Sequence, residues 1–216
     1  MGIFSRLFKK KTNTPALTGE VRQAFDHMMS ILNNDAKQNA LMPVQMQETF
    51  LKGDIVDEIN CAEGPFGRHP FNPIPVNGPL GEITYLSRLI TKDNGQHLFF
   101  HRLGSGSNID AYEVVSWDGS VWDVLYFDYY HMGKTRKAPD GYTFAEKVEG
   151  ITGTNKLLAS FPIGINEAAG ACACGILGVP LSNPYMRNIK TTGFAKPAAH
   201  AQFVQELLDA IHGRQK

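Results

Sequence analysis

Four strand-like runs follow one another between residues 82 and 129, and the connections between them are short and turn-like. The runs are 82–91, 96–103, 109–117 and 121–129. Connections this short leave no room for a crossover helix, so neighbouring runs have to pair antiparallel. Asp118-Gly119, between two β-rich runs, is a strong hairpin signal. The sequence therefore predicts a four-stranded antiparallel β-meander at the centre of the fold.

Both faces of this predicted sheet are largely apolar. In 109–117, one set of alternating residues is Ile109, Ala111, Glu113, Val115 and Trp117, and the other is Asp110, Tyr112, Val114 and Ser116. A face in contact with water would be more polar than either set. We therefore expect the sheet to be covered on both faces, by helices on one face and by something other than helices on the other.

Helical periodicity predicts an N-terminal helix over 18–33 and a C-terminal helix over 198–212. A small-residue helix is expected over 164–178, after a short helix that starts near residue 154 and breaks at Pro162. Residues 40–52 fit an edge strand, in which Pro43 is tolerated, or a helix that begins after Pro43. These helices and the meander together predict an α+β fold.

Residues 64–81 are rich in proline, and they precede the first strand-like run. Such a segment is stiff and lacks many backbone donors, so it is suited to lie across a sheet face or edge. We interpret it as an ordered wrapping loop that buries its apolar side chains. The alternative is a rigid wall of a binding cleft, in which Phe71 and Ile74 would be binding residues.

The first residues form a small amphipathic segment. Its apolar side chains are Ile3, Phe4, Leu7 and Phe8, and its basic ones are Arg6, Lys9 and Lys10. Such segments can lie on an anionic membrane surface; a frayed, solubilising terminus is the alternative. We divide the chain into this segment and its linker, residues 1–16, and a single α+β domain, residues 17–216.

Composition excludes several classes of protein. The formal net charge of the 216-residue chain is zero, which argues against a nucleic-acid partner gripped through a basic face. Three cysteines make a poor disulfide framework, so we expect reduced thiols and a cytoplasmic protein. The amphipathic N-terminal segment would place this protein at the inner face of a membrane. No apolar run is long enough to predict a membrane-spanning helix.

His101, Asp128 and His131 are candidate catalytic residues. Asp128 and His131 lie near the end of the fourth strand-like run, and His101 is in the second. We expect all three to meet at one sheet edge beside Tyr129 or Tyr130. Histidine and carboxylate groups in contact are suited to acid–base chemistry. The alternative is that they are ordinary hydrogen-bonding residues.

Two basic loops offer candidate binding residues. The first carries Lys134 and Arg136, and the second carries Arg187 and Lys190. If the loops converge, they favour an anionic partner; otherwise they are separate solvated cations.

Cofactor and metal motifs are weak. Cys172 and Cys174 are two residues apart, and on a helix they would point about 200° apart, which is poor geometry for one metal. The glycine-rich stretches 104–108 and 150–156 lack the context of a nucleotide fingerprint. We therefore expect no metal and no cofactor.

Taken together, these features predict a cytosolic binding or accessory protein with a protein partner, peripherally associated with a membrane through its N-terminus. One alternative is a small enzyme with a His/Asp/Tyr site at the edge of the meander. The other is a structural subunit of a larger complex.

Overall fold

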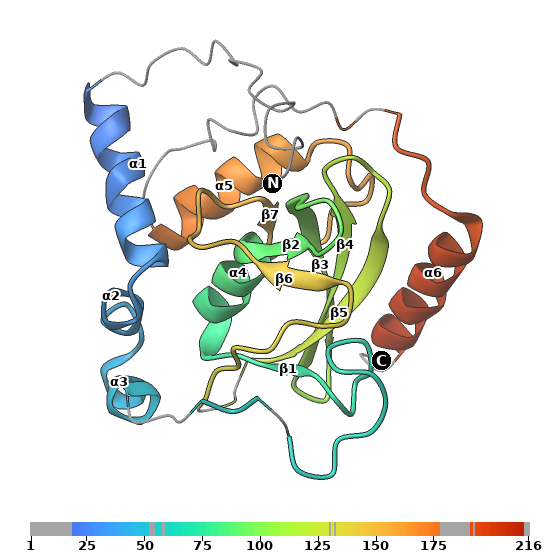
Figure 1. Ribbon diagram of the computed structural model, residues 1–216, viewed down its shortest axis with the longest axis horizontal. Coiled ribbons are helices and arrows are strands. Elements are labelled where there is room, and N and C mark those ends of the chain that lie inside the picture. The colour runs from blue at the N-terminus through green and yellow to red at the C-terminus, as the bar shows by residue number, and fades with distance from the viewer. Residues whose placement is uncertain are drawn as a thin grey trace, which may run out of the picture.

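The computed structural model describes residues 19–51, 55–57, 59–129, 131, 133–177, 191 and 193–213. Over these residues the chain contains helices and strands, which confirms the predicted α+β class (Figure 1). The helices are α1 (Gly19–Leu32), α2 (Asp35–Asn39), α3 (Val44–Leu51), α4 (Gly78–Arg88), α5 (Ile165–Leu177) and α6 (Ala198–Gly213). The strands are β1 (Ile74–Pro75), β2 (Leu89–Thr91), β3 (Leu98–Gly106), β4 (Ile109–Ser116), β5 (Trp122–Asp128), β6 (Tyr142–Phe144) and β7 (Gly153–Thr154).

The main sheet has the strand order β1-β5-β4-β3-β7. Strands β3, β4 and β5 form the antiparallel part, as expected from their short connections. The turn between β3 and β4 uses Ser107 and Asn108, both with positive φ, as two-residue hairpin turns require. The short edge strands β1 and β7 pair parallel with β5 and β3, so the sheet is mixed rather than a pure meander.

The first strand of the predicted meander, 82–91, is mostly helix. Helix α4 occupies Gly78–Arg88, and only β2 is extended, pairing with β6 in a separate two-stranded sheet. Pro79 suits the first turn of a helix, where no N–H partner is needed. Buried Leu80, Ile83 and Leu86 recur at the three-residue spacing of one helical face. Packing against the sheet therefore overrides the β-propensity of this segment.

Both faces of the sheet are covered, with helices on each side (Figure 1). The first face carries Phe100, Tyr112 and Phe127, which are fully buried in the main core beneath α4. The second face carries Leu103, Ala111, Val124 and Tyr126, which pack against Val204 of α6. Helix α6 is otherwise largely exposed along its length.

The proline-rich segment follows the outer edge of the sheet. Ile74 is fully buried and pairs with Phe127, and the N–H of Tyr126 donates to the carbonyl of Gly67 at 2.8 Å. Gly67 has φ +75, and a Cβ there would contact Ile74 and Pro139 within 3 Å. The segment is thus built into the edge of the sheet.

The remaining helix predictions can be compared directly. The N-terminal, small-residue and C-terminal helices are present as α1, α5 and α6. The open choice at 40–52 is resolved as α3, a helix that begins after Pro43. The short helix expected before Pro162 is absent, because residues 154–161 form a short strand end and turns.

Some predictions fall on residues outside the described ranges. Residues 1–18 are among these, so the membrane contact assigned to Ile3, Phe4, Leu7 and Phe8 and the boundary after residue 16 stay predictions. Within the described part of the chain, no helix is both long enough and apolar enough to cross a membrane.

Candidate functional site

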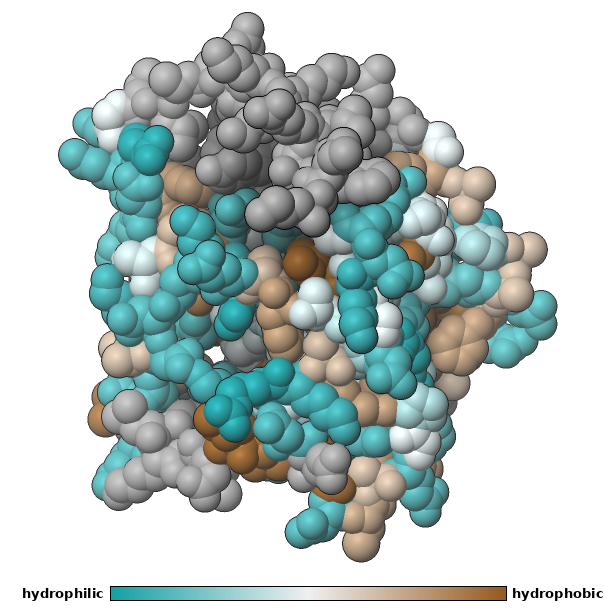
Figure 2. Space-filling model, in the orientation of Figure 1, coloured by the Kyte–Doolittle hydropathy of each residue, from teal (hydrophilic) through white to brown (hydrophobic). Residues whose placement is uncertain are grey.

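A cleft of about 540 Å³ opens between α2, α4, β6 and residues 134–136. The surface is hollowed beside α4 on the face shown in Figure 2. The lining combines cations, neutral polar groups and an apolar floor. It consists of Asp35, Gln38, Ile55, Val76, Asn77, Gly81, Thr84, Tyr85, Arg88, Lys134, Thr135, Arg136 and Phe144.

The end of the proline-rich segment forms one wall of this cleft. After β1, Val76 and Asn77 line the cleft, and Gly78 turns the chain into α4 with φ +80. The N–H of Gly78 donates to the carbonyl of Tyr129 at 2.9 Å. Residues 134–136 are joined to this segment, because the N–H of Thr135 donates to the carbonyl of Pro75 at 3.0 Å. The segment therefore acts both as a sheet edge and as a cleft wall.

Two of the cations lie in exposed ion pairs. Lys134 pairs with Asp35, whose side chain is 70% exposed. Arg136 lies 3.8 Å from Asp57, and its own side chain is 71% exposed. Asp57 also accepts the backbone N–H of Arg136 at 2.8 Å, which, with the hydroxyl of Thr135, holds the pKa of Asp57 below its ordinary value.

The third cation lies deeper in the cleft. The Nε and Nη2 groups of Arg88 donate to the carbonyl of Ala145 at 3.3 and 3.2 Å. Its guanidinium lies over the Phe144 ring, 5.4 Å from the centroid. The described lining thus holds Arg88, Lys134 and Arg136 against a single carboxylate, Asp35.

Neutral groups complete the cleft. Gln38 is held by its side-chain amide, which donates to the carbonyl of Leu32 at 2.9 Å, and it accepts from Thr84 at 3.4 Å. Asn77 makes no capping hydrogen bond to α4. Tyr85 donates its hydroxyl to the carbonyl of Lys137 at 2.7 Å, and burial raises its pKa, so the phenol stays neutral.

The predicted catalytic residue His101 lies on the second face of the sheet, away from this cleft. It is 2% exposed, and its Nε2 lies 2.8 Å from Oε2 of Glu113. Its Nδ1 accepts the N–H of Leu158 at 3.0 Å, so Nε2 carries the proton and the ring is neutral. Burial lowers the pKa of His101, in agreement with a neutral ring. Both ring nitrogens are therefore engaged.

Asp128 and His131 are not brought to His101. Glu113, opposite His101, pairs with Val124, whereas Asp128 lies at the far end of β5 opposite Ile109. The Nδ1 of His131 accepts the N–H of Gly133 at 3.1 Å. The catalytic role of these residues stays a prediction, without the shared location on which it was based.

His101 instead belongs to a cluster around Glu113 that the prediction missed. Oε1 of Glu113 accepts from Lys196 at 2.7 Å and from His200 at 2.9 Å. Burial would raise the pKa of Glu113, but the hydrogen bonds from His101, His200 and Lys196 lower it to about 2. The signal in the sequence was Glu113 itself, a lone carboxylate on an otherwise apolar strand face.

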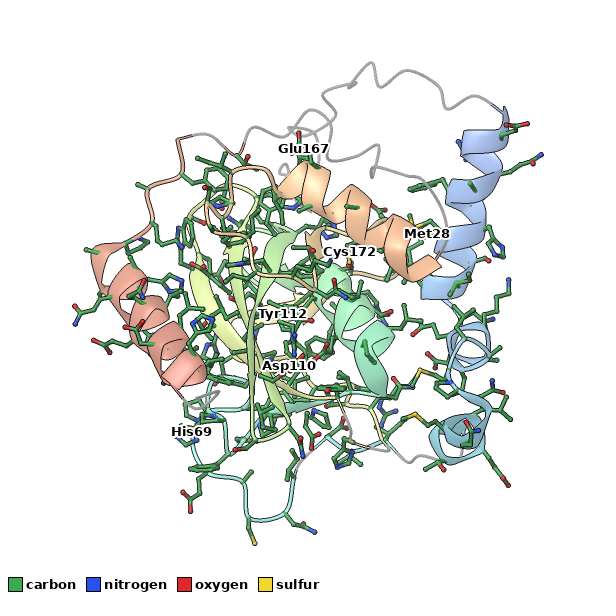
Figure 3. The ribbon with its side chains drawn as sticks, turned by 180° about the vertical axis from the view of Figure 1, so that it is seen from behind. Met28, His69, Asp110, Tyr112, Glu167 and Cys172 are labelled. Carbon is green, nitrogen blue, oxygen red and sulfur yellow. The ribbon has the colours of Figure 1, made fainter. Side chains whose placement is uncertain are left out.

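A second polar network lies in the main core, beneath α4, where Figure 3 shows Asp110 and Tyr112. Tyr112 donates its hydroxyl to Glu82 at 3.0 Å, and Arg102 pairs with Asp110 at 2.5 and 2.8 Å. Glu82 is 2% exposed; burial, reinforced by the nearby Asp110 charge, raises its pKa to about 9. The carboxyl group of Glu82 is therefore protonated at neutral pH.

The predicted binding residues have different positions. Lys134 and Arg136 line the cleft, Phe71 is 68% exposed, and Ile74 is fully buried in β1, where it cannot reach a partner. Arg187 and Lys190 lie outside the described residues, so convergence of the two basic loops stays a prediction. Among the described residues, no group of three or more His, Cys, Asp or Glu side chains is arranged to hold a metal ion.

No protein-family model matches this chain, and no curated protein or solved structure matches it either. Function is therefore inferred from the geometry and chemistry of the cleft alone.

Proposed function

We propose that this chain is a binding protein that holds a small organic anion in the cleft between α2, α4 and residues 134–136. The observation that supports this is the charge of the cleft: Arg88, Lys134 and Arg136 line it together with one carboxylate, Asp35, and Asp57 pairs with Arg136 from outside the lining. Cations therefore outnumber carboxylates here, on a chain of zero net charge. Guanidinium and ammonium groups gathered in a concave site favour carboxylate or phosphate groups.

The ion pairs at the rim are no obstacle to such a ligand. Exposed pairs such as Lys134–Asp35 and Arg136–Asp57 contribute little to stability, because water screens both charges. A ligand anion that is better enclosed would replace Asp35 or Asp57 as the partner of these cations. Arg88 would stay in place, because its contacts with Ala145 and Phe144 fix the guanidinium.

The volume and the floor of the cleft indicate the rest of the ligand. A volume of about 540 Å³ lies within the range of roughly 300–1,000 Å³ that small-molecule sites occupy. Val76, Tyr85 and Phe144 provide apolar surface beside the cations. A ligand with one anionic group and one apolar or planar part fits this combination.

Matched probes test the proposal directly. Phenyl phosphate and benzoate carry the required charge, whereas benzamide has a similar size and no charge. We expect both anions, but not benzamide, to raise the melting temperature and to give measurable binding heat in calorimetry. Lys134→Gln combined with Arg136→Gln should weaken anion binding by about tenfold or more, the cost of lost charge-assisted hydrogen bonds.

Two further variants sharpen this test. Thr84→Phe should obstruct the cleft and abolish binding, and Lys92→Gln, an exposed cation outside the lining, should leave binding unchanged. Equal binding of benzamide and benzoate, or full anion binding by the double variant, would refute the proposal.

The other predicted roles stand beside this one as proposals. A protein partner, an anionic membrane surface and a cytoplasmic location are neither required nor opposed by the cleft. For the enzyme alternative, acid–base chemistry at His101 would have to break one of its two ring-nitrogen hydrogen bonds.

A further inference from the structure

The anion cleft extends along the whole of α4. Asn77 lies at the start of this helix, Gly81 and Thr84 lie in its middle and Arg88 at its end, and all four line the cleft. An α-helix rises by about 1.5 Å per residue, so Asn77 and Arg88 are roughly 16 Å apart along the axis. A ligand that fills this cleft therefore lies along the helix and reaches both of its ends.

Arg136 lies towards the N-terminal end of α4. The N–H of the preceding Thr135 donates to the carbonyl of Pro75 at 3.0 Å, just before the helix begins. Arg136 lies 3.8 Å from Asp57, and Lys134 is likewise in an ion pair. This end of the cleft thus holds cations that already contact carboxylate groups of the chain.

Arg88 is the last residue of α4, at the other end of the cleft. Its Nε and Nη2 groups donate to the carbonyl of Ala145, and its guanidinium lies 5.4 Å from the centroid of the Phe144 ring. Unlike Arg136, it makes no ion pair with a carboxylate in the described ranges. Since an arginine carries five N–H donors, several remain for a ligand. Arg88 is therefore a fixed cation to which the described chain supplies no anion.

Between these two ends the floor of the cleft is aromatic. The rings of Tyr85 and Phe144 meet edge to face, with centroids 5.0 Å apart. The hydroxyl of Tyr85 is engaged, because it donates to the carbonyl of Lys137 at 2.7 Å. The centre of the cleft thus favours a planar apolar group, which would pack on these rings.

Building on the proposed function, we infer that the ligand of this cleft is a dianion: an elongated molecule with a carboxylate or phosphate group at each end and a planar apolar centre. One anionic group binds Lys134 and Arg136, and the other binds Arg88. The C-terminal end of α4 carries about half a negative charge, which the unit charge of Arg88 outweighs.

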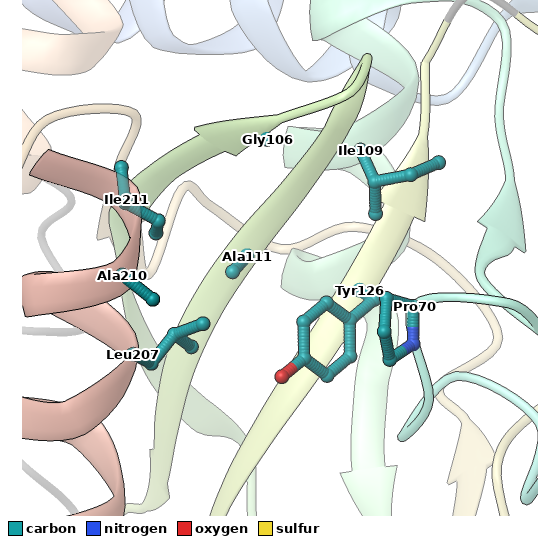
Figure 4. A pocket seen from close by; sticks show the side chains of 8 residues that line it. All are labelled: Pro70, Gly106, Ile109, Ala111, Tyr126, Leu207, Ala210 and Ile211. Atoms are coloured by element: carbon teal, nitrogen blue, oxygen red, sulfur yellow. The ribbon is translucent and has the colours of Figure 1, made fainter. Parts of the chain in front are cut away.

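Two other hollows in the described part of the chain do not offer such a pair of cations. The slot between α6 and the sheet holds about 110 Å³, and the phenol of Tyr126 is the one polar side-chain group among its described lining residues (Figure 4). A cavity of about 470 Å³ between residues 154–158 and α5 has one cation in its described lining, Lys156. A dianion is therefore expected at neither.

Isomeric dicarboxylates test the second anionic group with the charge held constant. Terephthalate carries its two carboxylates at opposite ends of the ring, phthalate carries them on adjacent carbons, and benzoate has one. In calorimetry on the full chain, we expect terephthalate to bind about tenfold or more tightly than phthalate or benzoate, the gain from one further charge-assisted contact.

Arg88→Gln connects this preference to the second end of the cleft. Glutamine keeps an amide donor for the carbonyl of Ala145 but removes the charge. The preference for terephthalate over phthalate should disappear in this variant, whereas Lys156→Gln, which removes a cation outside the cleft, should keep it. Melting temperatures show whether both variants are folded.

The outcomes separate this inference from the proposed function. Benzoate binding without a preference for terephthalate in the wild type would overturn the second anionic group and leave the proposed function standing. A preference that survives in folded Arg88→Gln would overturn the assignment of that group to Arg88. Absence of binding by all three acids would refute the proposed function, and the dianion with it.

Discussion

Glu82 of α4 and Glu113 of β4 are buried carboxyl groups on opposite sides of the main sheet. The two are held in opposite protonation states. Within the described ranges, the hydroxyl of Tyr112 is the one hydrogen-bond donor to Glu82, and burial raises the pKa of Glu82 to about 9. Glu113 has three donors, two histidines and a lysine, and despite burial its pKa falls to about 2. The hydrogen bonds to each carboxyl group and the charge beside it, Asp110 near Glu82 and Lys196 at Glu113, therefore decide which form each site stabilises.

Glu82→Gln should stabilise the protein increasingly as the pH rises. The folded chain keeps the Glu82 proton up to about pH 9, whereas the unfolded chain releases it above about pH 4.5, so folding takes up a proton between these values. The wild type thus loses about 1.4 kcal/mol of stability per pH unit across this window, and the glutamine variant avoids that loss.

Urea unfolding at about pH 5.5 and about pH 8.5 measures this difference. The stability gain of the variant should be larger at the higher pH by several kcal/mol. Glu63→Gln, which replaces an exposed carboxylate just before the proline-rich segment, serves as the control and should show no such trend. An equal effect of Glu82→Gln at both pH values would contradict the assigned proton.

At the scale of elements, the edge strand β7 depends on a very close approach. Gly153 pairs with Phe100 of β3, and a Cβ at this position would lie 2.2 Å from the Phe100 carbonyl oxygen and 2.4 Å from its ring. Phe100 is fully buried in the main core, so it cannot move aside. Glycine is therefore required for β7 to join the sheet.

Gly153→Ala should lower the free energy of unfolding by about 1–3 kcal/mol or more, because overpacking usually costs this much. Chemical denaturation checks this, with Gly19→Ala as the matched control. A Cβ at Gly19 would have nothing within 4 Å, so that variant should be neutral or slightly stabilised. A fully stable Gly153→Ala protein would show that β7 is not fixed to β3.

At the scale of the whole molecule, Glu113 connects the C-terminal helix to the sheet. His101 belongs to β3, Glu113 to β4 and His200 to α6, and Lys196 lies in the segment before α6. The ammonium of Lys196 also lies over the rings of Trp122 and Phe161, at 5.3 and 5.9 Å. Since α6 buries little of its own surface, this cluster is the main polar attachment of the helix.

Glu113→Gln should loosen α6 while the rest of the fold stays intact. Hydrogen exchange should become faster in 198–213 and remain unchanged in 19–32. In the wild type, the stabilisation from Glu113 is present above about pH 4.5 and is lost as the pH falls towards about 2, because the folded pKa is the lower one. The variant should lack this acid-dependent loosening; unchanged protection of α6 would contradict the attachment.

How much the sequence determined is clearest in the hairpins. The strands β3, β4 and β5 and their antiparallel pairing follow from turns of a few residues, such as Asp118-Gly119, whose geometry is local. Helices α1, α5 and α6 were equally predictable, because a buried stripe at helical spacing is also a local pattern.

The tertiary structure alone decided the rest. Residues 82–88 have strand-like composition, but burial of Leu80, Ile83 and Leu86 against the sheet makes them helical. The cleft joins α2, the end of the proline-rich segment, α4 and residues 134–136, which lie far apart in the sequence. The donors that set the charge of Glu113 likewise come from distant segments. Contacts between distant segments depend on how the elements pack, and local periodicity carries no information about that packing.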